Sequence, residues 1–313
     1  MKNIYKNSLL NLEKAKKILE RNNIISVPTE TVYGLAGNAY CNESIRKIYR
    51  LKKRPKKNPL IIHYYSIDDL RKDAYFDKKF FKLYKKFSPG PLTYILKKKK
   101  NSKISSLANA KLKSIAVRFP KNKIIRALLK KLNFPLAIPS ANISTGVSPI
   151  KASDVNDEFG KKIFFILDGG SSEIGLESTV VNLIGKTHVL RPGTISANQI
   201  GKVLKKRVKI LSKPKKIESP GLLKRHYSPG IPIKLNCKKS DYKAAFIVFG
   251  KQYKKGKDMF NLSKNGNLKE AGKNLYKTLR KIKKLKYKKI NVVKIPNRDV
   301  GIAINDKLKR ASN

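Results

Sequence analysis

The stretch LKKRPKKNPLIIH, residues 51–63, joins a helical pattern at about 43–52 to a strand-like apolar run at Leu60–His63. Two prolines, Pro55 and Pro59, interrupt regular structure between the two elements. A helix that leads through a short polar turn into an apolar strand is typical of α/β folds.

Similar patterns occur on both sides of this stretch. Six more apolar runs have the length of strands, and four more patterns have helical spacing. The strand-like runs are Ile24–Val27, Leu92–Leu96, Ile115–Phe119, Leu136–Ile138, Ile163–Leu167 and Thr179–Leu183, and the helical patterns lie at about 8–21, 78–87, 122–132 and 196–205. Their irregular order does not fit a regular βαβ repeat. The sequence therefore predicts one α/β domain over residues 1–205, a twisted mixed sheet with helices packed on it.

The rest of the chain divides into a linker and a smaller unit. Proline and glycine gather in a lysine-rich stretch at 206–240, which predicts an extended linker. Beyond it, the patterns predict strands at Ala244–Gly250 and Ile290–Ile295 and helices at Gly266–Leu285 and Val300–Ala311. Residues 241–313 thus form a small α/β domain, whose core is marginal alone and is expected to lean on the first domain.

The net charge of +53 is the most unusual property of the composition, since 73 of the 313 residues are Lys or Arg. Such a charge could indicate nucleic-acid binding. However, only 13 of the basic residues are Arg, and Lys is spread along almost every segment, so we interpret the excess mainly as compositional drift. The positive potential still favours anionic ligands.

Several classes of protein and of site are disfavoured by the sequence. No apolar run approaches the roughly 20 residues needed to span a membrane, and the N-terminus lacks the apolar stretch of a secretory signal, so we expect a cytoplasmic protein. Two cysteines and three histidines are too scattered for a metal cluster. No phosphate loop, GxGxxG or GxSxG motif is present, and only 20 residues are acidic, which favours chemistry by positioning and charge stabilisation.

Small polar and cationic side chains follow several predicted strands. They lie in the segments SVPTETVYGL (Ser26–Leu35), SIAVRFP (Ser114–Pro120), AIPSANISTGVSP (Ala137–Pro149) and GLESTVVNL (Gly175–Leu183). Hydroxyls and amides at strand ends can hold a small polar substrate or phosphate oxygens. Taken singly, the first three of these segments also fit plainer interpretations: a capped turn, an edge strand with its Arg in water, and a Ser-rich loop. The stretch LKKRPKKNPLIIH, taken alone, also fits a solvated charge run.

Taken together and in order, these segments resemble a known family. PTETVYGL, KKRPKKNPLIIH, SPGPLT, AVRFP, PSANIS, LDGG, LESTVV and RPG match the threonylcarbamoyl-AMP synthase family, whose catalytic module is the YrdC-like domain, over most of residues 24–195. HYSP in the linker and GIAINDKLKRAS (Gly301–Ser312) resemble the two-domain branch, whose second domain is Rossmann-like. The resemblance implies a twisted mixed YrdC-like sheet followed by that smaller domain.

The resemblance also implies a reaction. Members of the family join L-threonine, bicarbonate and ATP, with Mg²⁺, into threonylcarbamoyl-AMP and pyrophosphate. A separate transferase complex then moves the threonylcarbamoyl group onto the adenosine next to the anticodon of tRNA. The expected class is a nucleotidyltransferase, and the basic surface leaves room for a weak contact with tRNA.

Site residues carried over by the resemblance fall into two groups. Threonine would be bound by Thr31, His63, Arg118, Ile138 and Ser178. ATP would be bound by Arg54, Asn58, Ser114, Ser140, Asn142, Ser148, Arg191 and, from the linker, Tyr227, with Lys52 and Arg54 as the catalytic cations and no protein-bound metal. The linker would act as a lid that excludes water from the adenylate.

Two alternatives remain at this stage. A nucleic-acid-binding protein could use a basic, concave YrdC-like surface, but it would not need Thr31, His63 and Ser178. A carbamoyl-adenylating domain from hydrogenase maturation normally sits in a much longer chain with zinc-finger-like parts, which the length and the two cysteines do not fit.

Overall fold

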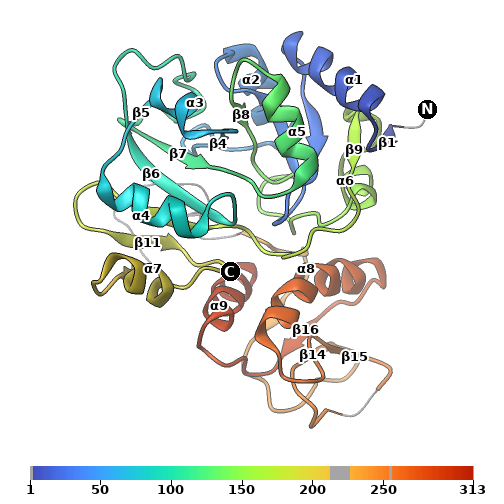
Figure 1. Ribbon diagram of the computed structural model, residues 1–313. Helices are drawn as coiled ribbons and strands as arrows, with labels where there is room; N and C mark the ends of the chain where they lie inside the picture. The colour runs from blue at the N-terminus through green and yellow to red at the C-terminus, as the bar shows by residue number, and fades with distance from the viewer. Residues whose placement is uncertain (1–2, 212–225, 254–255, 313) are drawn as a thin grey trace.

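The protein consists of two α/β units, each built on its own sheet (Figure 1). The computed structural model describes residues 3–211, 226–253 and 256–312. The helices within these residues are α1 Leu9–Glu20, α2 Asn42–Lys52, α3 Ile67–Arg71, α4 Lys78–Phe87, α5 Lys123–Lys131, α6 Ala152–Phe159, the 3-10 helix Gly160–Lys162, α7 Ala197–Leu204, α8 Leu268–Lys284 and α9 Val300–Ala311.

The larger unit holds a twelve-stranded mixed sheet in the described residues. Its strands run in the order β1-β9-β2-β3-β8-β4-β7-β6-β10-β11-β12, and β5 pairs with β6 beside this path. They are β1 Ile4–Lys6, β2 Ile25–Val27, β3 Gly34–Asn38, β4 Ile61–His63, β5 Ala74–Tyr75, β6 Leu92–Lys98, β7 Ser114–Arg118, β8 Leu136–Ala137, β9 Ile166–Asp168, β10 Thr179–Asn182, β11 His188–Arg191 and β12 Lys209–Ile210. The sheet contains both parallel and antiparallel pairs, so the predicted mixed sheet is confirmed.

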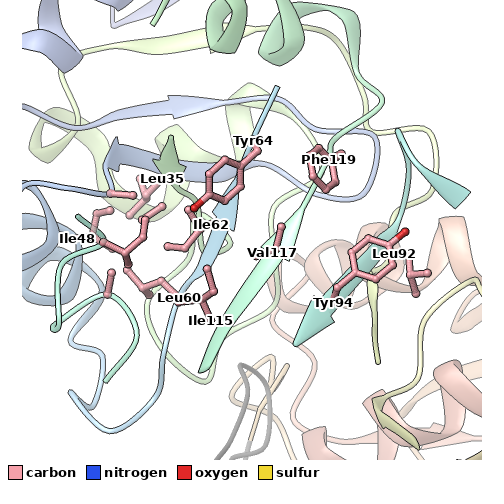
Figure 2. Packing of buried hydrophobic residues seen from close by; sticks show 14 of the residues in the cluster. Leu35, Ile48, Leu60, Ile62, Tyr64, Leu92, Tyr94, Ile115, Val117 and Phe119 are labelled. Atoms are coloured by element: carbon pink, nitrogen blue, oxygen red, sulfur yellow. The ribbon is translucent and has the colours of Figure 1, made fainter. Parts of the chain in front are cut away.

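Helices cover both faces of this sheet because neighbouring strand residues point to opposite sides. Helices α1 and α5 pack on one face, where their leucines meet Ile25, Val27 and Leu167. The other face carries the larger core, in which Leu35, Ile62 and Val117 meet residues from helices and loops. Figure 2 shows part of this core, with Tyr64 and Phe119 beside the central strands. The strand ends are therefore held rigidly.

The predicted helices of this unit agree with the structure to within two residues at each end, while some strands differ. The run Ile163–Leu167 was expected to be a strand, but β9 begins three residues later, where its parallel pairing with β1 starts. Strand β3 was not expected, because two glycines interrupt its apolar pattern. Gly34 is needed there, since a side chain would collide with the Ile138 side chain and the Pro139 carbonyl.

The smaller unit is a four-stranded parallel sheet in the order β13-β16-β14-β15. Its strands are β13 Ile233–Lys234, β14 Ala245–Val248, β15 Met259–Asn261 and β16 Ile290–Val292. Parallel strands with α8 between β15 and β16 agree with the expected Rossmann-like arrangement. The predicted helices at Gly266–Leu285 and Val300–Ala311 are confirmed as α8 and α9.

The expected linker at 206–240 supplies strands to both sheets. Its first part contains β12 of the large sheet and its last part contains β13 of the small one. Residues 212–225 of the expected lid lie outside the described residues. The stretch between β12 and β13 remains our proposed connection between the two units.

The two units share an apolar core, and hydrogen bonds and ion pairs also join them. Val32, Val147 and Leu176 of the first unit belong to the same buried cluster as Leu275 and Val300 of the second. Figure 1 shows α8 and α9 on the side of the small sheet that faces the larger unit. None of the helices in the described part of the chain is long and apolar enough to cross a membrane.

Candidate active site

A cavity lies where several strands of the large sheet end. Its lining residues come from the loops after β2 and β8, from the loop between α2 and β4 and the start of β4, from the end of β7, from the segment before β10, from β11 and from the linker. They are Thr31, Val32, Arg54, Leu60, Ile61, Arg118, Ile138, Pro139, Ser140, Glu177, Ser178, Arg191 and His226. The structure thus brings together four of the predicted threonine-site residues and three of the predicted ATP-site residues.

Arg118 lies at the end of β7 and is almost fully buried. Its Nη2 donates to Glu30 Oε1 at 2.7 Å, and its Nε donates to the Gly90 carbonyl at 3.3 Å. Glu30 also accepts from the backbone N–H groups of Lys121 and Asn122. The cation is therefore paired and held in one orientation, as a buried guanidinium requires.

Ser178 links this end of the cavity to a second arginine. Its hydroxyl lies 2.7 Å from the Thr93 hydroxyl, and Thr93 is the register partner of Arg118 across β6 and β7. Arg191 donates through Nε to the Ser178 carbonyl at 3.1 Å and through Nη2 to the Ser178 hydroxyl at 3.0 Å. Arg118 and Arg191 thus both line the cavity that Ser178 also lines, an arrangement that suits an anionic ligand.

Arg54 follows the left-handed C-cap of α2 at Lys53. Its guanidinium donates to the carbonyl of Asn58 at 3.0 Å and to that of Pro59 at 2.8 Å, and both acceptors lie in its own loop. Burial lowers the pKa of Arg54 to about 10, so the group remains charged at neutral pH. The short KRPKKNP loop therefore holds one cation against the cavity.

Lys52 does not line the cavity but supports its wall. Its ammonium is buried and donates to the carbonyls of Ser140 and Asn142, each at 2.5 Å. Burial and the neighbouring Arg54 hold the pKa of Lys52 well below its usual value. Across 88 positions of sequence, the hydrogen bonds of Lys52 thus tie the loop after β8 to the end of α2.

Asn142 and Ser148 belong to that loop and are buried. The Asn142 amide donates to the carbonyls of Ile143 and Gly146 and closes the loop on itself. The Ser148 hydroxyl donates to Glu177 Oε1 at 2.5 Å. The small side chains predicted for the ATP site thus give the loop its shape.

The described end of the linker closes the cavity. The backbone N–H of Ser228 donates to the Thr145 carbonyl, and His226 lines the cavity. Tyr227 is fully buried, and its ring stacks on Tyr276 with centroids 5.8 Å apart. The linker therefore docks on the loop after β8, where a lid would have to lie.

Three further predicted residues do not line the cavity. Asn58 is buried beneath the Arg54 loop, where its carbonyl accepts from Arg54. His63 pairs with Arg118 across β4 and β7, and burial together with that arginine holds the pKa of His63 well below its usual value. Ser114 begins β7, at the opposite end of the strand from Arg118.

Several buried polar atoms close to the cavity have no partner within the described residues. They are both amide atoms of Asn58, His63 Nε2, Asn142 Oδ1, the Ser144 hydroxyl, His226 Nδ1 and the Tyr227 hydroxyl. Buried polar groups are normally hydrogen-bonded, so a group of unpaired ones indicates a place for ligands or water. This supports binding roles for residues that do not line the closed cavity.

Comparison with known proteins agrees with this geometry. A family model described as "Telomere recombination" matches residues 17–193, and one described as "Threonylcarbamoyl-AMP synthase, C-terminal domain" matches residues 195–313. Together they span both units. The chain belongs to the threonylcarbamoyl-AMP synthase family.

Individual members of the family are similar over nearly their whole length. The threonylcarbamoyl-AMP synthases of Bacillus subtilis and Pyrococcus abyssi are each 32% identical, over 96% and 95% of this chain and 92% and 93% of their own. The structure of P. abyssi Sua5 complexed with L-threonine is 29% identical, with a TM-score of 0.90 over 99% of this chain and 97% of its own. The chain is therefore an enzyme of this family, and these relatives do not favour the alternative of an RNA-binding protein.

Two carboxylates of this site were not predicted from the sequence. Glu30 and Glu177 are both buried, and each accepts hydrogen bonds from residues far away in sequence. Glu30 lies within PTETVYGL and Glu177 within LESTVV, so the motifs contained the signal, but a single carboxylate in a loop does not reveal its partner. His226 was noted in the linker without a role.

Proposed function

We propose that this chain is an L-threonylcarbamoyladenylate synthase, a nucleotidyltransferase that forms threonylcarbamoyl-AMP and pyrophosphate from L-threonine, bicarbonate and ATP. The observation that carries the proposal is the cavity in which Arg54, Arg118 and Arg191 converge around small hydroxyl groups. Three cations in one cavity suit substrates that carry negative charge.

The ATP end comprises Arg54, Arg191 and the loop after β8. Arg54 is anchored by two carbonyls of its own loop and is preorganised to contact phosphate oxygens. Lys52 donates hydrogen bonds to the carbonyls of Ser140 and Asn142 and so fixes the loop that would face the nucleotide. In this proposal Lys52 and Arg54 stabilise the charge that develops as pyrophosphate leaves.

The threonine end comprises Arg118, Thr31 and Ser178, with His63 behind them. Arg118 would pair with the threonine carboxylate while Glu30 keeps the guanidinium in place. His63 is neutral at physiological pH because its pKa is lowered, so it can accept or donate a hydrogen bond without adding charge. Its unpaired Nε2 is available for that bond.

The reaction then follows from placing a threonine carbamate in line with the α-phosphate of ATP. The threonine amine forms a bond to the carbon of bicarbonate, and water leaves, giving a carbamate. A carbamate oxygen attacks the α-phosphorus of ATP, and the bond to the β,γ-pyrophosphate breaks. The protein contributes positioning and electrostatic stabilisation and does not form a covalent intermediate.

Magnesium enters this proposal as part of the MgATP substrate. Among the described residues, no group of three or more acidic, histidine or cysteine side chains could hold a metal ion. Glu177, the acidic residue of the cavity wall, has both oxygens engaged by hydroxyl groups. Mg²⁺ in such sites usually keeps several waters and binds substrate phosphates together with one or two carboxylates. In this proposal the phosphate oxygens and water supply its ligands.

The linker completes the proposal as a lid. Tyr227 would contact the nucleotide, and the closed arrangement would keep water from an adenylate that hydrolyses readily. We further propose that the enzyme acts in the cytoplasm and passes its product to a transferase complex that modifies tRNA. A weak contact of its basic surface with tRNA would fit this role.

Pyrophosphate release tests the proposal. Release should require ATP, L-threonine and bicarbonate together, and it should stop when any one of the three is omitted. Release that does not depend on threonine would refute the proposed function. Mass detection of threonylcarbamoyl-AMP in the complete mixture would identify the product.

A further inference from the structure

Helix α8 of the small unit reaches the wall of the cavity through Tyr276. The Tyr276 hydroxyl donates to Glu177 Oε2 at 2.6 Å, and the Ser148 hydroxyl donates to the other oxygen, Oε1, at 2.5 Å. Tyr276 and Ser148 are fully buried, and Glu177 is nearly so. A short, charge-assisted chain of hydrogen bonds thus connects the small unit to the loop that carries Ser148.

A second residue of α8 holds the same loop directly. Arg280 lies four positions after Tyr276, on the same face of the helix. It donates through Nη2 to the Val147 carbonyl at 2.6 Å and through Nε to the Ser148 carbonyl at 3.4 Å. Its guanidinium also lies 3.5 Å from Glu158. One face of α8 therefore contacts both the side chain and the backbone of this loop.

The packing under these contacts leaves α8 little freedom to shift. A side chain at Gly272 of α8 would press against Leu176 and Val300 at 3.0 Å. Gly175 has a positive φ of 72°, and a side chain there would meet the Lys273 carbonyl at 2.6 Å. Such close approach between backbones fixes the helix against residues 175–177.

We propose that Tyr276 is a positioning residue for ATP, which sets Ser148 through Glu177, with Arg280 holding the backbone of the same loop. Glu177 lines the cavity, and each of its oxygens already accepts a hydrogen bond, so in this proposal it orients the loop. The small unit is then part of the nucleotide site. This inference rests on the proposed function, because Ser148 is a proposed ATP ligand.

Tyr276→Phe tests the inference with the smallest change. Phenylalanine keeps the ring and its stacking on Tyr227 and removes only the bond to Glu177. We expect the KM for ATP to rise roughly tenfold, as for the loss of one hydrogen bond to a charged group, while the KM for threonine stays the same. The matched control is Tyr287→Phe, which removes a 2.6 Å bond to Asp258 within the small unit. An equal KM for ATP in both variants would overturn the inference.

A double variant tests whether Tyr276 acts through Ser148. If it does, Tyr276→Phe should add little to the KM for ATP once Ser148→Ala is present, because the linked contact has already been lost. Independent, multiplying effects would show that the ring acts by another route and would contradict the proposal. Thermal unfolding of each variant checks that the fold is retained.

Hydrogen exchange separates this inference from the proposed function. In the full chain without nucleotide, the amides of residues 140–149 should exchange faster in Tyr276→Phe than in Tyr287→Phe. That difference would support the positioning role even if pyrophosphate release did not depend on threonine. Equal exchange in the two variants would refute the positioning role, whatever reaction the enzyme catalyses.

Discussion

Removal of Glu30 should destabilise the protein strongly, because the carboxylate neutralises a buried arginine. Glu30 Oε1 lies 2.7 Å from Arg118 Nη2, and the side chains are 2% and 5% exposed. In Glu30→Ala, Arg118 would stay buried without its partner. The backbone N–H groups of Lys121 and Asn122, which lead into α5, would lose their acceptor as well.

The size of the effect follows from this burial. Breaking a buried ion pair by removing one partner typically costs about 3–5 kcal/mol, a large part of the roughly 5–15 kcal/mol that stabilises an ordinary domain. Because the chain has no Trp, equilibrium urea unfolding is best followed by circular dichroism. Glu30→Ala, Arg118→Ala and the double variant together give the coupling energy of the pair.

The matched control is Glu13→Ala, which breaks a short but largely exposed pair with Lys131. Solvent screens that pair, so the unfolding midpoint should move little. A loss below about 1 kcal/mol in Glu30→Ala, or a double variant as unstable as the sum of the two single ones, would refute the reasoning. Arg118 would then be free to pair with threonine without help from Glu30.

The remaining predictions concern the cation loop, the buried histidines and the lid. Arg54→Ala should raise the KM for ATP about tenfold or more in pyrophosphate-release assays, because two anchoring bonds and a charge are lost. Arg50→Ala, an exposed change in the last turn of the preceding helix α2, should not raise it, and an unchanged KM in Arg54→Ala would refute the clamp role. Burial, before any neighbouring charge, lowers the pKa of His63 and His226 well below the usual value, so only the unfolded state takes up these protons as the pH falls below about 6.5. The contribution of these histidines to the free energy of unfolding is fully present above that pH and declines below it, by up to about 1.4 kcal/mol per pH unit for each histidine. The urea midpoints measured at about pH 7.5 and about pH 5.5 should therefore lie closer together in the His63→Gln, His226→Gln double variant than in the unchanged protein. Deletion of residues 219–230 should slow adenylate formation, and unchanged turnover would remove the case for Tyr227.

Elements with a strong local pattern could be predicted from the sequence. The expected helix Gly266–Leu285 agrees with α8 because Leu275, Leu279 and Ile282 repeat along one buried face. Strands that depend on a distant partner could not be predicted. Residues Lys209–Ile210 form a strand because they pair with β11, and nothing in two residues of local sequence reveals that pairing.

The site was predicted in part for a similar reason. Motifs placed Arg54 at a helix end and Arg118 and Ser178 in or beside strands, and the cavity does bring these three together. The carboxylates of the site could not be predicted, because the role of a carboxylate depends on the residues that it contacts in the fold. Glu177 and Tyr276 are 99 positions apart, in different units, and only the packing of α8 brings them together.

The large net charge of the chain explains little of the positive charge in the cavity. Each cation of the cavity is held by specific acceptors: Arg118 by Glu30, Arg54 by two loop carbonyls and Arg191 by Ser178. The many surface lysines contribute a diffuse field, which salt screens within about 8–10 Å under ordinary conditions. Binding at the cavity should therefore depend on the orientation of a few arginines, whereas any contact with RNA should weaken as salt is added. The composition alone could not separate these two sources of positive potential, because it counts charges without showing which ones are buried and held in place.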